Sequence, residues 1–367
     1  MKSRVSIVKC LTYDPEQVSI SLDRALGLLG GLGAFVKKGE KVLIKPNMLS
    51  ARPPEYGANT NIEVVRACVG LVKKQGAVPV IADNPGGSIT PRQAYEGSGL
   101  LKIAEQEGIE CLEKKDVRMV NGFPIASYFF ECDKIISIPK MKTHSLMGLT
   151  GAVKNMYGAV VGLNKTELHK KFPKPEEFAR IIVDVFQIVR PYLVLMDGIV
   201  AMEGDGPAAG PLRKAGILLA GQDSVAVDSV FAGLIGVDPF GIITTKEAAK
   251  RGLGEADPAN IEILGESLQD SAIQKFKLPR SSMLLNLHPG IMRLAASFIK
   301  FGPFIDKKLC KKCMVCAKTC PVSAITINNR DSKIDRKECI RCMCCHEVCP
   351  YNAVKLKRNI LARGFGL

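Results

Sequence analysis

The feature that most constrains this chain is a duplicated cysteine motif near its C-terminus. Each copy reads C-x2-C-x2-C-x3-C-P, and the second copy follows the first by 29 residues. The flanking residues repeat as well, which indicates a duplicated unit whose halves each supply a metal-binding loop and a short helix. The cysteines of the two copies are Cys310, Cys313, Cys316 and Cys320, and Cys339, Cys342, Cys345 and Cys349.

This spacing predicts two [4Fe–4S] clusters. Three thiolates two residues apart bind one face of a cubane, and the fourth, followed by proline, points away to complete the other cubane. The predicted ligand sets are therefore crossed: Cys310, Cys313, Cys316 and Cys349 for one cluster, and Cys339, Cys342, Cys345 and Cys320 for the other. Structural zinc is the alternative, but zinc sites do not normally need two such motifs in tandem. Cys344 stands where the first copy has Val315, and we expect a packed thiol without a ligand role.

The cysteine block resembles the bacterial two-cluster ferredoxins at every motif position, and this resemblance implies low-potential, one-electron transfer. Crowded cysteines in a chain without an export signal indicate metal ligation rather than disulfides.

The N-terminus lacks the long apolar stretch of a signal peptide, and no run approaches the roughly 18 apolar residues of a membrane span. We therefore expect a cytoplasmic protein that is not integral to a membrane.

The chain carries a formal net charge of +15. Residues 300–367 hold fifteen Lys and Arg against five Asp and Glu, so +10 of this excess lies in the last fifth of the chain. Part of it offsets the clusters, because eight thiolates on two oxidised cores add a charge of about −4. The remainder is expected to face an acidic redox partner or an anionic surface. No recognised nucleic-acid module accompanies it, so nucleic acid is not the expected partner.

A length of 367 residues predicts two domains. Before the cysteines, apolar runs alternate with amphipathic helical patterns, which predicts an α/β fold: a mostly parallel sheet with helices on both faces. Predicted strands are 4–9, 41–46, 78–83, 134–139, 192–197 and 215–220, and predicted helices are 15–30, 61–75, 98–107, 177–189, 223–235 and 245–252.

The predicted domains are an α/β domain at 1–275, a linker at 276–304, a small α+β ferredoxin-like domain at 305–358 and a basic tail at 359–367. In the linker region, Leu294, Phe298 and Phe301 recur at helical spacing. Such a stripe either lies on a membrane interface or packs the helix against its own protein, and we favour packing.

Ligands of α/β folds bind beyond the carboxyl ends of the strands. The segments after the predicted strands supply the candidate ligand-binding residues Lys45, Asn47, Lys142, Asn155, Asp197, Glu203 and Asp205. Taken singly, such residues have structural alternatives, such as a surface lysine, a helix cap or a tight glycine loop. Their convergence on one sheet edge favours a site. The acidic loop at 203–210 suits a divalent cation or a polyhydroxylated ligand better than a phosphate, so a further metal or organic cofactor stays open.

His144 and Lys154 form the most specific pair of candidate catalytic residues. A histidine after a strand, with a lysine ten residues later in a glycine-bounded stretch, supplies a base and an electrophilic or covalent amine. The rival interpretation is structural: a histidine hydrogen-bonded under a loop, and a lysine that pairs with Asp197 or Glu203. The sequence leaves both open.

Several segments together resemble the Domain of Unknown Function 362 family, whose members often carry a C-terminal ferredoxin module. They are KPN at 45–47, PKMKTH at 139–144, TGAVKNMYG at 150–158, LHKKF at 168–172, DGIVAMEGDGPAAG at 197–210 and DSVAVD at 223–228. The H-x9-K pair is also similar to the nickel-pincer lactate racemase family, in which a lysine anchors the cofactor and a histidine acts nearby. That similarity implies the same roles for Lys154 and His144, although the other metal and catalytic positions of that family have no clear counterpart here.

Three hypotheses about function follow. The first is an iron–sulfur oxidoreductase of ferredoxin type, in which the clusters exchange electrons with a small-molecule substrate at the edge of the α/β sheet. The second is an electron carrier that docks a partner enzyme and has no catalysis of its own. The third is a non-redox racemase-like or isomerase-like enzyme whose clusters are structural or regulatory.

Overall fold

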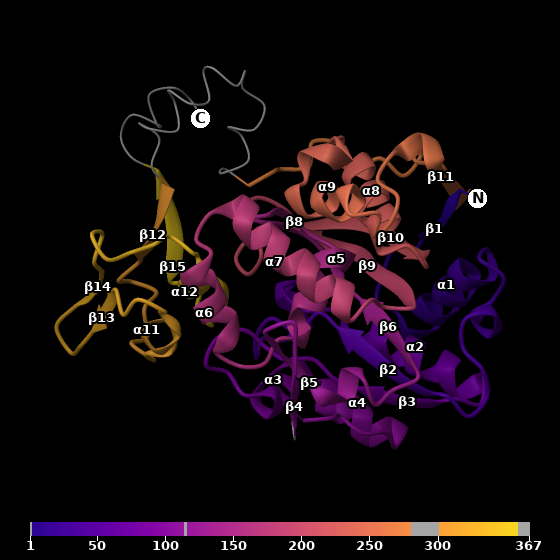
Figure 1. The fold of residues 1–367 in the computed structure, drawn as a ribbon, viewed down its shortest axis with the longest axis horizontal. Helices are drawn as coiled ribbons and strands as arrows, with labels where there is room; N and C mark the ends of the chain where they lie inside the picture. Colours follow the sequence, from indigo (N-terminus) through magenta and orange to yellow (C-terminus); the bar gives the residue numbers. More distant parts are fainter. Residues whose placement is uncertain (1, 114–115, 280–300, 359–367) are drawn as a thin grey trace.

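The computed structural model describes residues 2–113, 116–279 and 301–358. An α/β domain and a small C-terminal module lie side by side, and the module, drawn in yellow, sits against one end of the larger domain (Figure 1). The helix predicted within the linker, with Leu294 and Phe298, and the basic tail at 359–367 lie outside the described residues. No helix in the described part of the chain is long and apolar enough to cross a membrane.

The α/β domain is built on a nine-stranded sheet with the main strand order β11-β1-β10-β9-β6-β2-β3. Pairs β2–β3, β2–β6, β6–β9 and β1–β11 are parallel, whereas β10 is antiparallel to both of its neighbours. Strands β7 and β8 lie off this path, and β7 pairs in parallel with β9. The strands are β1 (Ser3–Lys9), β2 (Lys41–Pro46), β3 (Val78–Ile81), β6 (Lys134–Ile138), β7 (Lys140–His144), β8 (Gly148–Thr150), β9 (Leu193–Met202), β10 (Leu212–Gly221) and β11 (Ile261–Gly265).

Helices cover both faces of this sheet, which confirms the predicted α/β class (Figure 1). Alternate residues of strand β9 pack in the hydrophobic cores on opposite faces of the sheet. Leu195 packs in the core with α1 and α2, whereas Val194 and Met196 pack in the core with α8. A strand buried on both faces is continuously apolar, which is why these strands could be predicted. The helices are α1 (Pro15–Gly27), α2 (Ile62–Lys74), α3 (Pro91–Ser98), α4 (Leu100–Glu107), α5 (Ala152–Asn155), α6 (Asn164–Lys171), α7 (Pro175–Ile188), α8 (Ser224–Leu234) and α9 (Ile243–Lys250).

Side-chain caps begin several of these helices. Asp14 accepts a hydrogen bond from the backbone N–H of Gln17 at the start of α1, and Asp223 accepts from Val225 and Ala226 at the start of α8. Such a cap satisfies backbone donors that the first helical turn leaves free. Asp223 is thus a helix cap, one of the structural alternatives that the sequence left open.

The C-terminal module has two pseudo-equivalent halves. Two short antiparallel pairs, β12 (Phe301–Ile305) with β15 (Val354–Arg358) and β13 (Ile325–Ile327) with β14 (Ser332–Ile334), accompany two one-turn helices. Helix α11 (Val315–Thr319) follows the first cysteine loop, and α12 (Cys344–Val348) follows the second. Left-handed backbone recurs 29 residues apart at Met314 and Met343, each the N-cap of its helix. The duplicated sequence therefore folds twice into the same loop and helix.

Candidate functional site

The predicted ligands of one cluster surround a common space. Cys320, Cys339, Cys342 and Cys345 all line a cavity of about 20 Å³ inside the C-terminal module. Their order in the chain is the crossed one, because Cys320 comes from the first motif and the other three come from the second. Residues of this cavity thus match the donor set that a cubane requires.

The other predicted ligand set is also gathered. Burial, and then repulsion by the nearby thiols of Cys349, Cys313 and Cys310, raises the pKa of Cys316 to about 12. Thiols crowded in this way ionise only when a metal neutralises their charge. Backbone N–H groups also reach the fourth cysteine of each motif, from Ala324 to Cys320 Sγ and from Ala353 to Cys349 Sγ, at 3.3 Å in both cases.

Arg52 supplies positive charge from the α/β domain. Its guanidinium is buried, and within the described part of the chain its Nε and Nη2 atoms have no hydrogen-bond partner. Burial lowers the pKa of Arg52, while the neighbouring Cys349 raises it. A buried cation with free N–H donors beside a cluster ligand fits the negative charge of a bound cluster.

The same residues do not fit a single metal ion. Among the described residues, no three His, Cys, Asp or Glu side chains lie close enough together to hold one ion. A cubane spaces its four thiolates further apart than one zinc ion does. The described part of the α/β domain likewise gathers no set of three carboxylates for a divalent cation.

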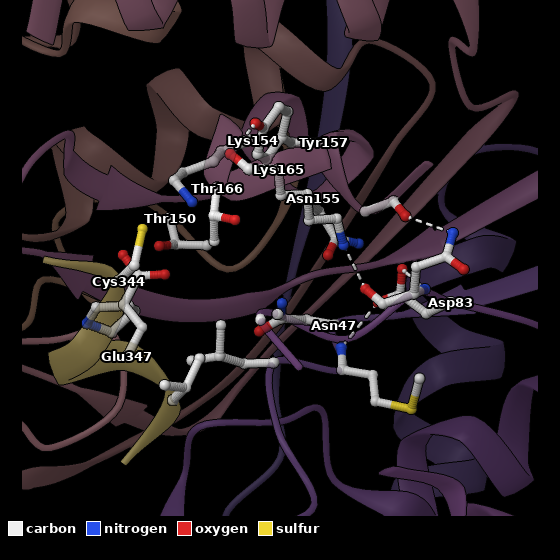
Figure 2. Close-up of a pocket in the computed structure, with 18 of the residues that line it drawn as sticks. Asn47, Asp83, Thr150, Lys154, Asn155, Tyr157, Lys165, Thr166, Cys344 and Glu347 are labelled. Carbon is white, nitrogen blue, oxygen red and sulfur yellow. Dashed lines mark hydrogen bonds between the residues drawn. The ribbon is translucent and has the colours of Figure 1, made fainter. Parts of the chain in front are cut away.

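A second cavity lies between the two domains. It measures about 80 Å³, enough for a few water-sized groups. Its α/β wall includes Asn47, Lys142, Lys154 and Asn155, four of the residues predicted from the sequence. Its opposite wall is helix α12, from which Cys344 and Glu347 project toward Lys154, Thr150 and Thr166 (Figure 2). The remaining lining side chains include Asp83, Tyr157, Lys165, His169, Thr319 and Val348.

Two glycines let polar groups approach helix α5, which carries Lys154 and Asn155. The Asp228 carboxylate accepts hydrogen bonds from the backbone N–H groups of Ala152 and Val153, at 2.5 and 3.0 Å. A Cβ at Gly151 would collide with that carboxylate, and a Cβ at Gly158 would collide with Asp83. The glycines of TGAVKNMYG are therefore explained by close packing around the cavity.

Lys45 lies behind the cavity wall. Its Nζ is 2.8 Å from Asp83 Oδ1 and 3.4 Å from Asn155 Oδ1, and the lysine is fully buried. Burial lowers the pKa of Lys45, whereas Asp83 raises it. Breaking a buried ion pair is costly, because the loss of one partner leaves an uncompensated charge. The pair therefore stays in place and fixes the side chains that contact it. Lys45 is thus placed to orient Asn155 rather than to touch a ligand.

His144 joins the two domains and does not face the cavity. Its Nδ1 accepts hydrogen bonds from the backbone N–H groups of Leu146 and Met147, and its Nε2 lies 3.2 Å from Glu347 Oε1. Burial, and then the charge of Lys154, lowers the pKa of His144 to about 4. The neutral ring therefore carries its proton on Nε2, toward Glu347 of α12. This is the geometry of a histidine under a loop, the structural alternative left open above.

Three other candidate residues lie away from the cavity. Asp197 is buried, with Oδ2 2.7 Å from Lys140 Nζ and Oδ1 2.8 Å from the Tyr13 hydroxyl. Glu203 Oε2 accepts from the backbone N–H of Lys277 at 3.1 Å. The backbone carbonyl of Asp205 lies 3.1 Å from Nε2 of His346 in α12, so this loop contacts the C-terminal module. Among the described residues, these three carboxylates do not form a group that could hold a cation, which was one of the two kinds of ligand left open for the loop at 203–210.

The sequence did not predict the residues that α12 and α6 contribute to the site. Glu347 and Cys344 lie on α12, and Lys165 and Thr166 on α6. The two cysteine motifs contain a usable signal, because Cys344 and Glu347 stand where the first copy has Val315 and Lys318. A position that is not a cluster ligand, and that differs between the two copies of the motif, is a candidate for a function that only one copy has.

The fold and this site define an α/β protein joined to a ferredoxin-type module. Residues 42–233 match the model of a domain of unknown function, DUF362, and residues 302–350 match a 4Fe–4S dicluster domain. The chain belongs to the DUF362 family. A thylakoid-associated protein of Synechocystis sp. is 30% identical over 307 residues, covering 82% of this chain and 94% of that protein.

Two solved structures are more distant. A crystal structure of a protein from Thermotoga maritima has a TM-score of 0.35 and 14% identity, covering 57% of this chain and 56% of the other. The lactate racemase apoprotein from Thermoanaerobacterium thermosaccharolyticum has a TM-score of 0.37 and 13% identity, covering 60% and 54%. This chain thus matches just over half the length of each, and at these scores the likeness supports no argument about activity.

Proposed function

We propose that this protein is an iron–sulfur oxidoreductase in which the ferredoxin module exchanges electrons with a small molecule bound in the interdomain cavity. The observation that carries this proposal is the position of Cys344, which lines both the cavity of the predicted cluster ligands and the interdomain cavity. When bound, [4Fe–4S] clusters each exchange one electron, so two clusters suit a two-electron reaction.

The protein's own residues enclose the reacting space. Helix α12 closes one side, and it also carries Cys345, a member of the predicted cluster set. Lys154 faces α12 across the cavity and is the residue that we assign to contact the ligand. His144 Nε2 lies 3.2 Å from Glu347 Oε1, and we assign His144 as a positioning residue for α12. The pKa of Glu347 is lowered: burial opposes its ionisation, but His144 and Lys154 outweigh burial.

The test uses the holoprotein reduced with dithionite. We expect a deproteinised small-molecule extract to reoxidise the wild-type clusters, followed as recovery of visible absorbance, at least tenfold faster than those of Lys154→Met. Lys246→Met, an exposed lysine on α9, should behave as the wild type. Ferricyanide should oxidise all three at one rate, since it does not need the cavity. Equal rates with the extract would contradict the proposal.

The electrons require a partner, which we infer to be an acidic carrier protein. Cys313 is exposed, and so are the lysines that flank it in sequence, Lys308, Lys311 and Lys312. An exposed cluster ligand among positive charges suits electrostatic docking of a negative surface.

The free thiols outside the module, such as Cys10 and Cys68, suit a reducing compartment such as the cytoplasm.

Docking of this kind predicts a strong dependence on salt. Reduction by an acidic flavodoxin should be at least tenfold slower for the charge reversal Lys308→Glu/Lys311→Glu/Lys312→Glu at low ionic strength, and the difference should shrink at about 0.5 M salt because the charges are then screened. The matched control reverses three other exposed lysines, Lys37, Lys38 and Lys74. Equal stopped-flow rates for the two triple variants would exclude this face as the entry point.

A further inference from the structure

The interdomain cavity holds more positive charge than its carboxylates balance. Lys142 from β7, Lys154 from α5 and Lys165 from α6 all line it, together with the carboxylates of Asp83 and Glu347. Asp83 is already paired with Lys45, and Glu347 faces His144. Within the described ranges, none of the three lysines has a carboxylate at ion-pairing distance.

Backbone carbonyls satisfy only part of these ammonium groups. Lys142 Nζ donates to the carbonyl of Ala58 at 2.6 Å, and Lys165 Nζ donates to Asn84 and Pro85 at 2.5 and 3.2 Å. In the described part of the chain, the ammonium group of Lys154 makes no hydrogen bond; burial lowers the pKa of Lys154, whereas Glu347 and Cys344 raise it. Three lysines therefore converge on a space in which counter-charge is missing.

Neutral polar atoms also point into this space without partners. Thr150 is 3% exposed, and its Oγ1 has no hydrogen-bond partner among the described residues. The side-chain oxygen of Asn47 is buried and equally unsatisfied there. Buried polar atoms without partners are rare in proteins and indicate a missing ligand or water. Thr150, Lys154 and Thr166 all line this cavity, so hydroxyl and ammonium donors face the same space (Figure 2).

The electrostatics of the lysines agree with this geometry. Burial, and then the charge of Lys154, holds the pKa of Lys142 well below its usual value. Burial lowers the pKa of Lys165 to about 7, with Lys45 and Lys154 adding to the effect and Asp83 and Glu347 opposing it. An anion bound in the cavity would stabilise the charged form of each lysine and so raise its pKa. By linkage, the charged lysines in turn stabilise the bound anion by the same free energy.

We propose that the interdomain cavity binds the oxyanion group, carboxylate or phosphate, of a small molecule, held by Lys154 and Lys165 with the Thr150 hydroxyl. The cavity volume of about 80 Å³ admits a group of this size. This inference rests on the proposed function and narrows its substrate to an anionic compound. Ammonium and hydroxyl donors on separate elements are the usual means of binding such groups.

The test measures binding to the oxidised holoprotein, without any reductant. Inorganic phosphate and malonate serve as separate probes for the two oxyanion classes, and glycerol serves as a neutral probe. We expect saturable binding of at least one anion by calorimetry, weakened about ten- to a hundredfold in Lys154→Met and in Lys165→Met, because each loses a charge-assisted hydrogen bond. Thr150→Val should show a smaller loss, and Lys246→Met none.

Melting of the ligand-free variants separates binding from a structural role. Lys154→Met removes a desolvated ammonium group that makes no hydrogen bond in the described part of the chain, so it should weaken anion binding without lowering the melting temperature. A structural lysine would do the opposite. Absence of saturable binding of both anions, or equal affinity in wild type and Lys154→Met, would overturn this inference. No electron moves in this binding assay, so it is independent of the reoxidation test described above. If anion binding is absent but reoxidation still depends on Lys154, only the anionic nature of the substrate is rejected and the proposed function stands.

Discussion

Anaerobically purified protein is expected to contain about eight iron and eight sulfide per chain, as two [4Fe–4S] clusters require. Cys320→Ser should lower this content to about four of each, because the thiol of Cys320 shares its cavity with those of Cys339, Cys342 and Cys345. Iron and sulfide analysis, with electron paramagnetic resonance of the reduced protein, measures both quantities. The signal that survives should belong to the cluster of Cys310, Cys313 and Cys316.

Cys344→Ser is the matched control for this experiment. It changes a buried thiol one residue from a predicted ligand, and it should keep about eight iron. If this variant lost a cluster signal, the ligand register would be wrong. Stoichiometric zinc in the wild type would reject the clusters altogether.

Asp197→Asn is expected to lower the free energy of unfolding by about 3–5 kcal/mol, because it leaves Lys140 buried without its counter-charge. Asp197 also accepts hydrogen bonds from the Tyr13 hydroxyl and from the backbone N–H of Asn61, so its loss affects three elements. The denaturant midpoint of the α/β domain measures the effect. Iron content and anion binding should stay at wild-type values, since Asp197 lies away from both sites.

A double variant tests whether the buried charge is the cause. Lys140→Met/Asp197→Leu removes both charges and should recover much of the lost stability, as apolar replacements of buried ion pairs commonly do. Asp23→Asn, at an exposed position on α1, is the control for the chemical change. If Asp197→Asn were as stable as this control but lost anion binding, Asp197 would belong to the ligand site after all.

The predicted strands were the most accurate part of the sequence analysis. β2 spans Lys41–Pro46 as predicted, and β6 spans Lys134–Ile138, one residue shorter than predicted. Such strands are buried on both faces, so their sequences are continuously apolar. By contrast, β7 (Lys140–His144) was not predicted, because its residues Lys140, Lys142, Thr143 and His144 are polar although all are buried. Only tertiary partners reveal that burial.

The positions of Asp197, Glu203 and Asp205 differ from the prediction because one strand is longer than expected. β9 was predicted to end at Asp197, but it continues to Met202. Five further residues at about 3.3 Å each carry the following loop about 17 Å onward. Asp197 therefore lies within the strand, and Glu203 and Asp205 begin well beyond the expected sheet edge. The other cavity wall, α12, depends on how two domains dock, which local sequence patterns do not encode.

Helix α12 has a consequence for how this protein would fail. One turn of helix supplies a predicted cluster ligand, Cys345, and two residues of the cavity wall, Cys344 and Glu347. So short a helix has little stability of its own and depends on what anchors it. Oxygen damage to the cluster would therefore loosen the cavity wall as well. Under the proposed function, a molecule with a damaged cluster could no longer supply electrons and would also bind its substrate less tightly, so it would not hold that substrate in an inactive complex.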